Sequence, residues 1–183
     1  FSHSFFLFMF KKLPLGLLLI SPFSALAHPH AFIDMQTKPL VKDNQLLGFS
    51  TQWLLDEASS SAVLYDVKQA KGDKAAQQKL VDEVMANVVN EHYFSYVFDK
   101  ENHKIKYTKH PENYGMRVKG NEVEYYFDFL LAQPQALQNN EFTLMTYDRT
   151  YYVAMRYAET GKRAVDFSSL PANCKGEVLE PNV

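Results

Sequence analysis

The sequence predicts an α+β domain, with a mostly antiparallel β sandwich or curved sheet and a helical insertion between the second and third strands. Three observations predict this class. Apolar and polar residues alternate with a period of two in several short segments, one central segment has helical spacing, and turn-forming residues separate the strands. No internal repeat or low-complexity linker divides the chain, so we expect one domain.

The first two strands are expected to form an antiparallel hairpin. Residues 31–41 alternate loosely, and Lys42-Asp43-Asn44 supplies the turn before a second strand at residues 46–55. Every other residue of the second strand falls on one face: Leu47, Phe49, Thr51, Trp53 and Leu55.

A helical insertion follows Asp56-Glu57, which end the second strand. Residues 58 to about 93 have helical composition, and Gly72-Asp73 divides them into two helices. The apolar positions of the second helix recur at helical spacing: Val81, Val84, Met85, Val88 and Val89.

The period of two returns after the helices, and turn-rich segments separate the later strands. The strands are expected at residues 94–98, 104–108, 114–119, 123–131, 142–147 and 151–157. A total of six to eight short antiparallel strands, counting the hairpin, is enough for a sandwich or a curved sheet.

The N-terminal segment has the features of a cleaved export signal. Lys11-Lys12 precedes an apolar run at residues 13–23, which is too short to span a bilayer, and Ala25-Leu26-Ala27 matches a signal-peptidase site. We expect residues 1–27 to be a signal peptide with its translation start at Met9. Residues 28–183 would then be a single periplasmic domain.

Net charge and cysteine content argue against a nucleic-acid-binding protein and against a fold held by an intramolecular disulfide. Removing residues 1–27 takes two of the 19 basic residues and none of the 21 acidic ones, which leaves a net charge of −4. Nucleic acid is therefore not an expected partner, because phosphate binding needs a clustered basic surface. The single cysteine, Cys174, permits no intramolecular disulfide.

The expected cleavage leaves His28-Pro29-His30 as the new N-terminus. Residues i and i+2 of an extended segment project to the same side, roughly 6.5–7 Å apart along the backbone, so two imidazoles can converge on one ion. Pro29 restricts its own φ and favours an extended His28. Zinc, nickel, cobalt and copper all suit imidazole, and imidazole chemistry alone does not choose among them.

Two imidazoles leave a tetrahedral ion short of ligands, and carboxylates are the natural candidates to complete the shell. Asp56 and Glu57 end the neighbouring strand and Asp148 ends a later one, so we predict a metal site of His28, His30, Asp56, Glu57 and Asp148. Asp34 shares the face of His28 and His30. Other histidines are alternatives, with His92 ahead of His103 and His110.

Binding rather than catalysis is the expected activity, because the sequence contains no G-x-S-x-G, no H-E-x-x-H and no phosphate-binding glycine loop. Two other functions stay open. The first is a copper or nickel protein of efflux or resistance, in which the α-amine and imidazole of His28 hold the ion. The second is an interaction module whose exposed aromatic residues contact a membrane protein.

Three motifs together resemble the DUF1007 family of bacterial periplasmic proteins, whose zinc-binding members are called ZevA. They are the opening at residues 28–34, the strand end at residues 53–57 and the segment at residues 147–154. The positions that match the recurring pattern are His28, His30, Asp34, Trp53, Asp56, Glu57, Asp148 and Tyr151.

The resemblance implies a periplasmic metal-binding component that works beside an inner-membrane permease of the nickel/cobalt-transporter type, the ZevB partner. Members of the family have also been labelled as binding components of ABC transporters. We therefore expect a periplasmic zinc-binding protein that supports zinc acquisition and has no small-molecule substrate other than the metal ion. The residues alone leave open which metal is physiological and in which direction it moves.

Overall fold

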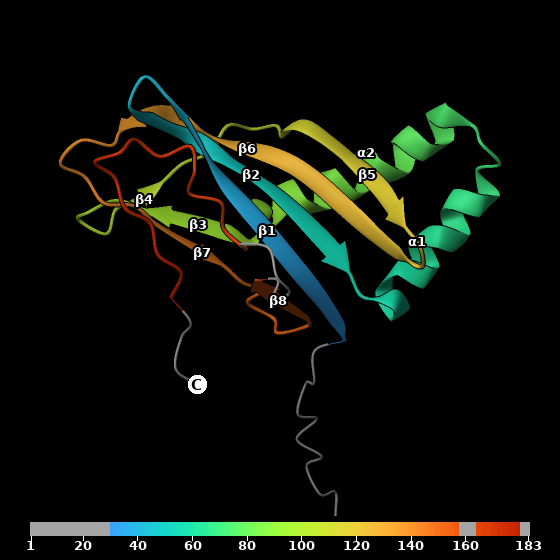
Figure 1. Ribbon diagram of the computed structural model, residues 1–183. Helices are drawn as coiled ribbons and strands as arrows, with labels where there is room; N and C mark the ends of the chain where they lie inside the picture. Colours follow the sequence, from blue (N-terminus) through green and yellow to red (C-terminus); the bar gives the residue numbers. More distant parts are fainter. Residues whose placement is uncertain (1–29, 158–163, 180–183) are drawn as a thin grey trace, which may run out of the picture.

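The computed structural model describes residues 30–157 and 164–179 (Figure 1). Its large sheet has five strands in the order β5-β6-β2-β1-β8, and a small sheet has the order β4-β3-β7. The strands of the large sheet are β1 Ala31–Lys42, β2 Gln45–Leu55, β5 Glu112–Lys119, β6 Glu122–Ala136 and β8 Val153–Tyr157. Those of the small sheet are β3 Ser95–Phe98, β4 Lys104–Ile105 and β7 Thr143–Thr146.

The predicted α+β class is confirmed, with antiparallel pairing dominant and two helices inserted after β2. One pairing differs from the expected antiparallel pattern, because β8 runs parallel to β1 from Ala31↔Val153 to Met35↔Tyr157. The chain reaches β8 from the small sheet and enters the edge of the large sheet in the direction of β1. The alternation of apolar and polar residues within one strand does not indicate whether that strand runs parallel or antiparallel to its neighbour.

The β1–β2 hairpin forms as predicted, but the inner face of β2 differs at one position. Phe49, Thr51 and Trp53 are buried, whereas Leu46 is buried in place of Leu47. The pairing of β2 with β6 shifts between Leu46 and Gly48, and such a bulge reverses the side to which the preceding residues point.

Side-chain caps explain where the two helices begin. Asp56 accepts a hydrogen bond from Ser59 N at the start of α1 (Glu57–Gln69), and Asp73 accepts bonds from Ala75 N and Ala76 N at the start of α2 (Lys74–Asn90). The predicted apolar face of α2 is confirmed. Its most buried members are Val81, Met85 and Val88.

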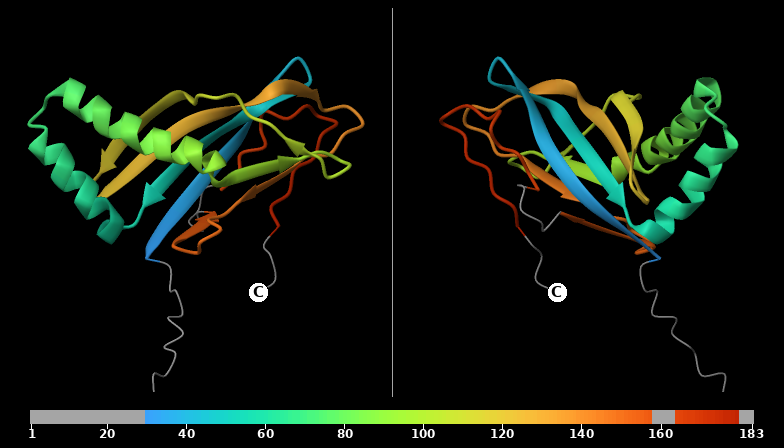
Figure 2. Two further views of the ribbon diagram at one scale, coloured as in Figure 1. Left: turned by 180° about the vertical axis from the view of Figure 1, so that it is seen from behind. Right: turned by 45° about the vertical axis from the view of Figure 1, so that its right-hand side comes forward.

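The core lies between the inner face of the large sheet and a layer made of α2 and the small sheet, which cover that same face (Figure 2). Aromatic rings fill its centre. Phe127 contacts Trp53 edge-on with centroids 4.8 Å apart, and Tyr93 stacks on Phe129 at 5.2 Å. Tyr93 lies in the 3₁₀ turn η2 (His92–Phe94), where the chain leaves the helices with three consecutive positive φ values.

A buried serine attaches α1 to the large sheet. Ser60 Oγ accepts a hydrogen bond from Val123 N at 2.9 Å and donates one to Leu55 O at 3.3 Å. The start of α1 is therefore held against the ends of β2 and β6. No helix in the described ranges combines the length and the apolar character needed to cross a membrane.

Candidate functional site

The candidate site is the end of the large sheet where β1 begins, at the lower tip of the sheet in Figure 1. His30 N donates a hydrogen bond to Tyr152 O at 2.8 Å, and the His30 ring lies 4.9 Å from the Tyr152 ring. The His30 side chain is exposed. Its backbone is thus attached to the loop before β8 while its imidazole stays accessible.

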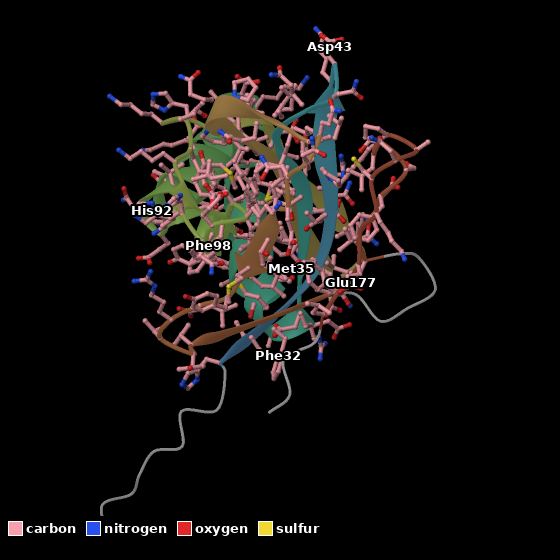
Figure 3. All side chains as sticks on the ribbon, turned by 90° about the vertical axis from the view of Figure 1, so that its left-hand side faces the viewer. Phe32, Met35, Asp43, His92, Phe98 and Glu177 are labelled. Atoms are coloured by element: carbon pink, nitrogen blue, oxygen red, sulfur yellow. The ribbon has the colours of Figure 1, made fainter. Side chains whose placement is uncertain are left out.

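Asp56 joins the end of β2 to the start of β1. One carboxylate oxygen accepts a hydrogen bond from Phe32 N at 2.8 Å, and the other accepts one from Ser59 N at 2.7 Å. Asp56 N in turn donates to Phe32 O at 3.1 Å. Figure 3 shows Phe32 at this end of the strand and Asp43 at the opposite end. The carboxylate therefore fixes the backbone two residues after His30.

Asp148 fixes the loop that His30 contacts. Its Oδ1 accepts hydrogen bonds from Thr150 N at 2.9 Å and Thr150 Oγ1 at 2.8 Å. Its Oδ2 accepts bonds from Val153 N at 2.9 Å and Thr150 Oγ1 at 3.0 Å. Because Val153 pairs with Ala31, this side chain also sets the position of β8 beside β1.

The fold thus brings four of the five predicted ligands to one end of the sheet: His30, Asp56, Glu57 and Asp148. His28, the fifth, lies outside the described residues. Glu57 is exposed in the first turn of α1. The face-sharing Asp34 forms an ion pair with Arg156 Nε at 2.5 Å, across the β1–β8 pairing.

The two structural carboxylates are held in their ionised form. Burial raises the pKa of Asp56, but hydrogen bonds from Ser59 and Phe32 outweigh it and bring this pKa below its ordinary value of 3.8. Burial likewise raises the pKa of Asp148, and bonds from Thr150 and Val153 bring it below the same value. Both groups are negatively charged at neutral pH.

These depressed pKa values predict a loss of stability in acid. A carboxyl whose pKa is lower in the folded state stabilises the fold above its unfolded pKa, and the stabilisation disappears as the pH falls through the folded pKa. We expect the contribution of both groups to be complete above pH 3.8 and to decline below it. Denaturant unfolding as a function of pH checks this, and Asp56→Asn should show a smaller decline; an equal decline in both proteins would contradict it.

A different group of side chains has the spacing of a metal site. Ligand atoms of Asp99, Glu101 and His103 lie within 4.8 Å of one another at the β3–β4 turn. Among the described residues, this is the group of three or more His, Cys, Asp or Glu side chains whose ligand atoms lie this close together. His30 does not belong to it. The alternating Asp-x-Glu-x-His spacing is the signal that could have identified it, whereas sequence reasoning treated His103 as an exposed turn residue.

That turn also has an ordinary structural explanation. Asp99 Oδ1 accepts hydrogen bonds from Glu101 N at 2.9 Å and His103 N at 2.8 Å, and Asp99 Oδ2 lies 3.3 Å from His103 Nδ1. Such bonds from a turn aspartate are typical of tight loops. The β3–β4 turn is separate from the candidate site, and a variant in this turn can therefore serve as a control for the site.

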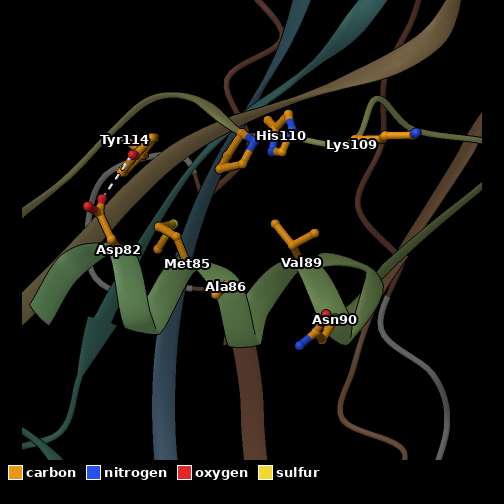
Figure 4. Close-up of a pocket in the computed structure, with 9 residues that line it drawn as sticks. Asp82, Met85, Ala86, Val89, Asn90, Lys109, His110 and Tyr114 are labelled. Carbon is orange, nitrogen blue, oxygen red and sulfur yellow. Dashed lines mark hydrogen bonds between the residues drawn. The ribbon is translucent and has the colours of Figure 1, made fainter. Parts of the chain in front are cut away.

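The two remaining alternative histidines lie elsewhere. His92 is exposed in the turn after α2, away from Phe32 (Figure 3). His110 lines a cavity of about 420 Å³ between α2 and the chain before β5 (Figure 4). The acid in that cavity, Asp82, accepts a hydrogen bond from Tyr114 Oη at 2.9 Å. Neither histidine joins His30.

Comparison with known proteins supplies a family but no activity. The family described as "Protein of unknown function (DUF1007)" matches residues 13–183. An uncharacterized protein of Haemophilus influenzae is 60% identical over 173 residues, which cover 94% of this chain and 82% of the relative. No solved structure matches the chain.

Proposed function

This chain belongs to the DUF1007 family of proteins of unknown function, and on that premise we propose that it is a periplasmic zinc-binding protein. In this proposal it resembles the ZevA proteins and passes zinc to an inner-membrane permease of the nickel/cobalt-transporter type. The observation that carries the proposal is that the His30 imidazole is exposed while its backbone is hydrogen-bonded to Tyr152, at the same end of the sheet as Asp56 and Glu57.

The surroundings of His30 favour a metal ion over an organic ligand. The ring is exposed and lies against Tyr152, and it lines neither the cavity between α2 and β5 nor the smaller one beside Cys174. An accessible imidazole at a fixed position needs only one further imidazole and a carboxylate to hold zinc. His28 is two residues away in the sequence and supplies the second imidazole in this proposal.

The three predicted carboxylates differ in what they can offer an ion. A carboxylate has about four acceptor positions. The Glu57 carboxylate accepts no hydrogen bond among the described residues. Asp56 accepts hydrogen bonds from Ser59 and Phe32, which leave part of its capacity for a cation. Asp148 accepts from three donors, Thr150 N, Thr150 Oγ1 and Val153 N, and both of its oxygens share the Thr150 hydroxyl. We therefore propose that Glu57 and Asp56 complete the shell and that Asp148 positions the loop.

Calorimetric titration of the metal-free chain from His28 onward with zinc, nickel, cobalt and copper tests this function. We expect zinc to bind, and its affinity to fall as the pH is lowered, because imidazole must be neutral to coordinate a metal ion. Copper binding that requires a free α-amine would favour the efflux alternative. No binding of any ion would contradict the proposal and favour the interaction module.

A further inference from the structure

The outward face of the small sheet carries aromatic, thioether and cationic side chains. We call this surface the aromatic-cationic face and define it by Tyr96, Phe98, Lys104, Met145, Tyr147 and Arg149. The opposite face of the same sheet packs into the core through residues such as Val97 and Leu144. The aromatic-cationic face therefore points away from the large sheet.

Strand register places these side chains together. Tyr96 pairs with Met145, and Phe98 pairs with Lys104, so each pair shares one side of the sheet. Residues two apart on a strand also share a side, which adds Tyr147. Its ring lies 5.3 Å from the Tyr96 ring.

Two cations lie on this face without a carboxylate partner. Lys104 Nζ lies 4.6 Å and Arg149 Cζ lies 4.9 Å from the centre of the Tyr96 ring, which they cover so that Tyr96 is only 6% exposed. Within residues 30–157 and 164–179, neither cation forms an ion pair. The cation–π contacts hold both charges at the sheet surface without an ion pair among the described residues.

Large apolar groups lie between the charges. Met145 is 47% exposed and Tyr147 is 40% exposed. Tyrosine is favoured at the boundary of a bilayer, where its ring enters the apolar region and its hydroxyl remains hydrated. Lysine and arginine extend their charged groups to the headgroups at the same depth.

We infer that the aromatic-cationic face docks the protein onto an anionic lipid bilayer. Charge complementarity identifies the occupant, since cations without an ion pair among the described residues flank exposed apolar side chains on one sheet surface. The chain as a whole has a net charge of −2, so the attraction must be local to this face.

The inference goes beyond the proposed function and does not depend on it. Arg149 and Tyr152 belong to the same loop, and Tyr152 contacts His30. A membrane against the aromatic-cationic face would therefore lie on the side of the loop that joins this face to the start of β1.

Vesicle co-sedimentation tests the docking. The chain from His28 onward contains every described residue and lacks the apolar run at residues 13–23, which could bind lipid by itself. We expect it to bind vesicles of phosphatidylethanolamine and phosphatidylglycerol more tightly than vesicles of phosphatidylcholine, and to be released by salt. Lys104→Gln/Arg149→Gln should weaken binding about fivefold for each charge removed.

The matched control is Lys38→Gln/Lys42→Gln on β1, which removes the same charge from the large sheet and should bind as the parent does. Met145→Glu places an acid on an already exposed position and should abolish binding without unfolding the chain, as circular dichroism would show. Equal binding by both double variants, equal binding to neutral vesicles, or no binding to either composition would overturn the inference. His30→Ala should leave vesicle binding unchanged, so this result is separable from the metal titration.

Discussion

The His28→Ala/His30→Ala variant is expected to lose more than about 100-fold in zinc affinity. Loss of a group that merely supports a ligand typically costs about 10–100-fold, so removal of two ligands should cost more. His30 is exposed and forms its hydrogen bond through the backbone, which alanine preserves. The fold should therefore survive, and calorimetry on the folded variant would report the metal site alone.

Two control variants make this result specific. His92→Ala/His110→Ala removes the same number of imidazoles from exposed positions outside the candidate site and should bind zinc as the parent does. His103→Ala removes the one imidazole of the β3–β4 turn. If zinc binding were lost in His103→Ala and kept in His28→Ala/His30→Ala, the ion would belong to that turn and the proposed site would be wrong.

Asp148→Ala is expected to lower the free energy of unfolding by about 2–5 kcal/mol. The change leaves Thr150 N and Val153 N, whose bonds to Asp148 are part-buried, without their acceptor, and each unsatisfied donor costs about 1–3 kcal/mol. Asp148 is only 8% exposed, so water cannot readily replace the carboxylate. Urea unfolding monitored by the fluorescence of Trp53 measures the change.

The same variant distinguishes a positioning residue from a ligand. If Asp148 acts by holding the loop, Asp148→Ala should lower stability in the absence of metal, and zinc affinity should fall only as far as the loop moves. A ligand role predicts the reverse, with little change in metal-free stability and a large loss of affinity. Glu57→Ala is the matched test, because Glu57 is exposed and should affect zinc affinity without affecting stability.

Local pattern was enough to predict most of the fold. The alternation around Phe49, Thr51 and Trp53 and the spacing of Val81, Met85 and Val88 identify elements whose burial the structure confirms. These signals are reliable because one buried face imposes a period on the sequence of its own strand or helix. The exchange of Leu46 for Leu47 escaped prediction, since a bulge depends on pairing with β6.

The sequence predicted only part of the chemistry of the candidate site. The sequence by itself indicates an imidazole pair with acids at two strand ends, because residue type and parity are local properties. It does not show that Asp56 accepts Phe32 N, or that Asp148 accepts Val153 N, since both bonds join segments whose approach depends on the whole sheet. These bonds distinguish Asp56 and Asp148, whose carboxylates hold the backbone in place, from Glu57, whose carboxylate does not.

The sequence therefore determined the α+β class, the hairpin, the helical insertion and the kinds of side chain available for binding. Tertiary structure decided which of them meet: the parallel entry of β8 beside β1 brings the Asp148 loop to His30, and the register of β3 with β7 gathers the aromatic-cationic face. The physical reason is that propensity and periodicity act within a segment. The direction and register of a pairing are set by the packing energy of residues far apart in the chain.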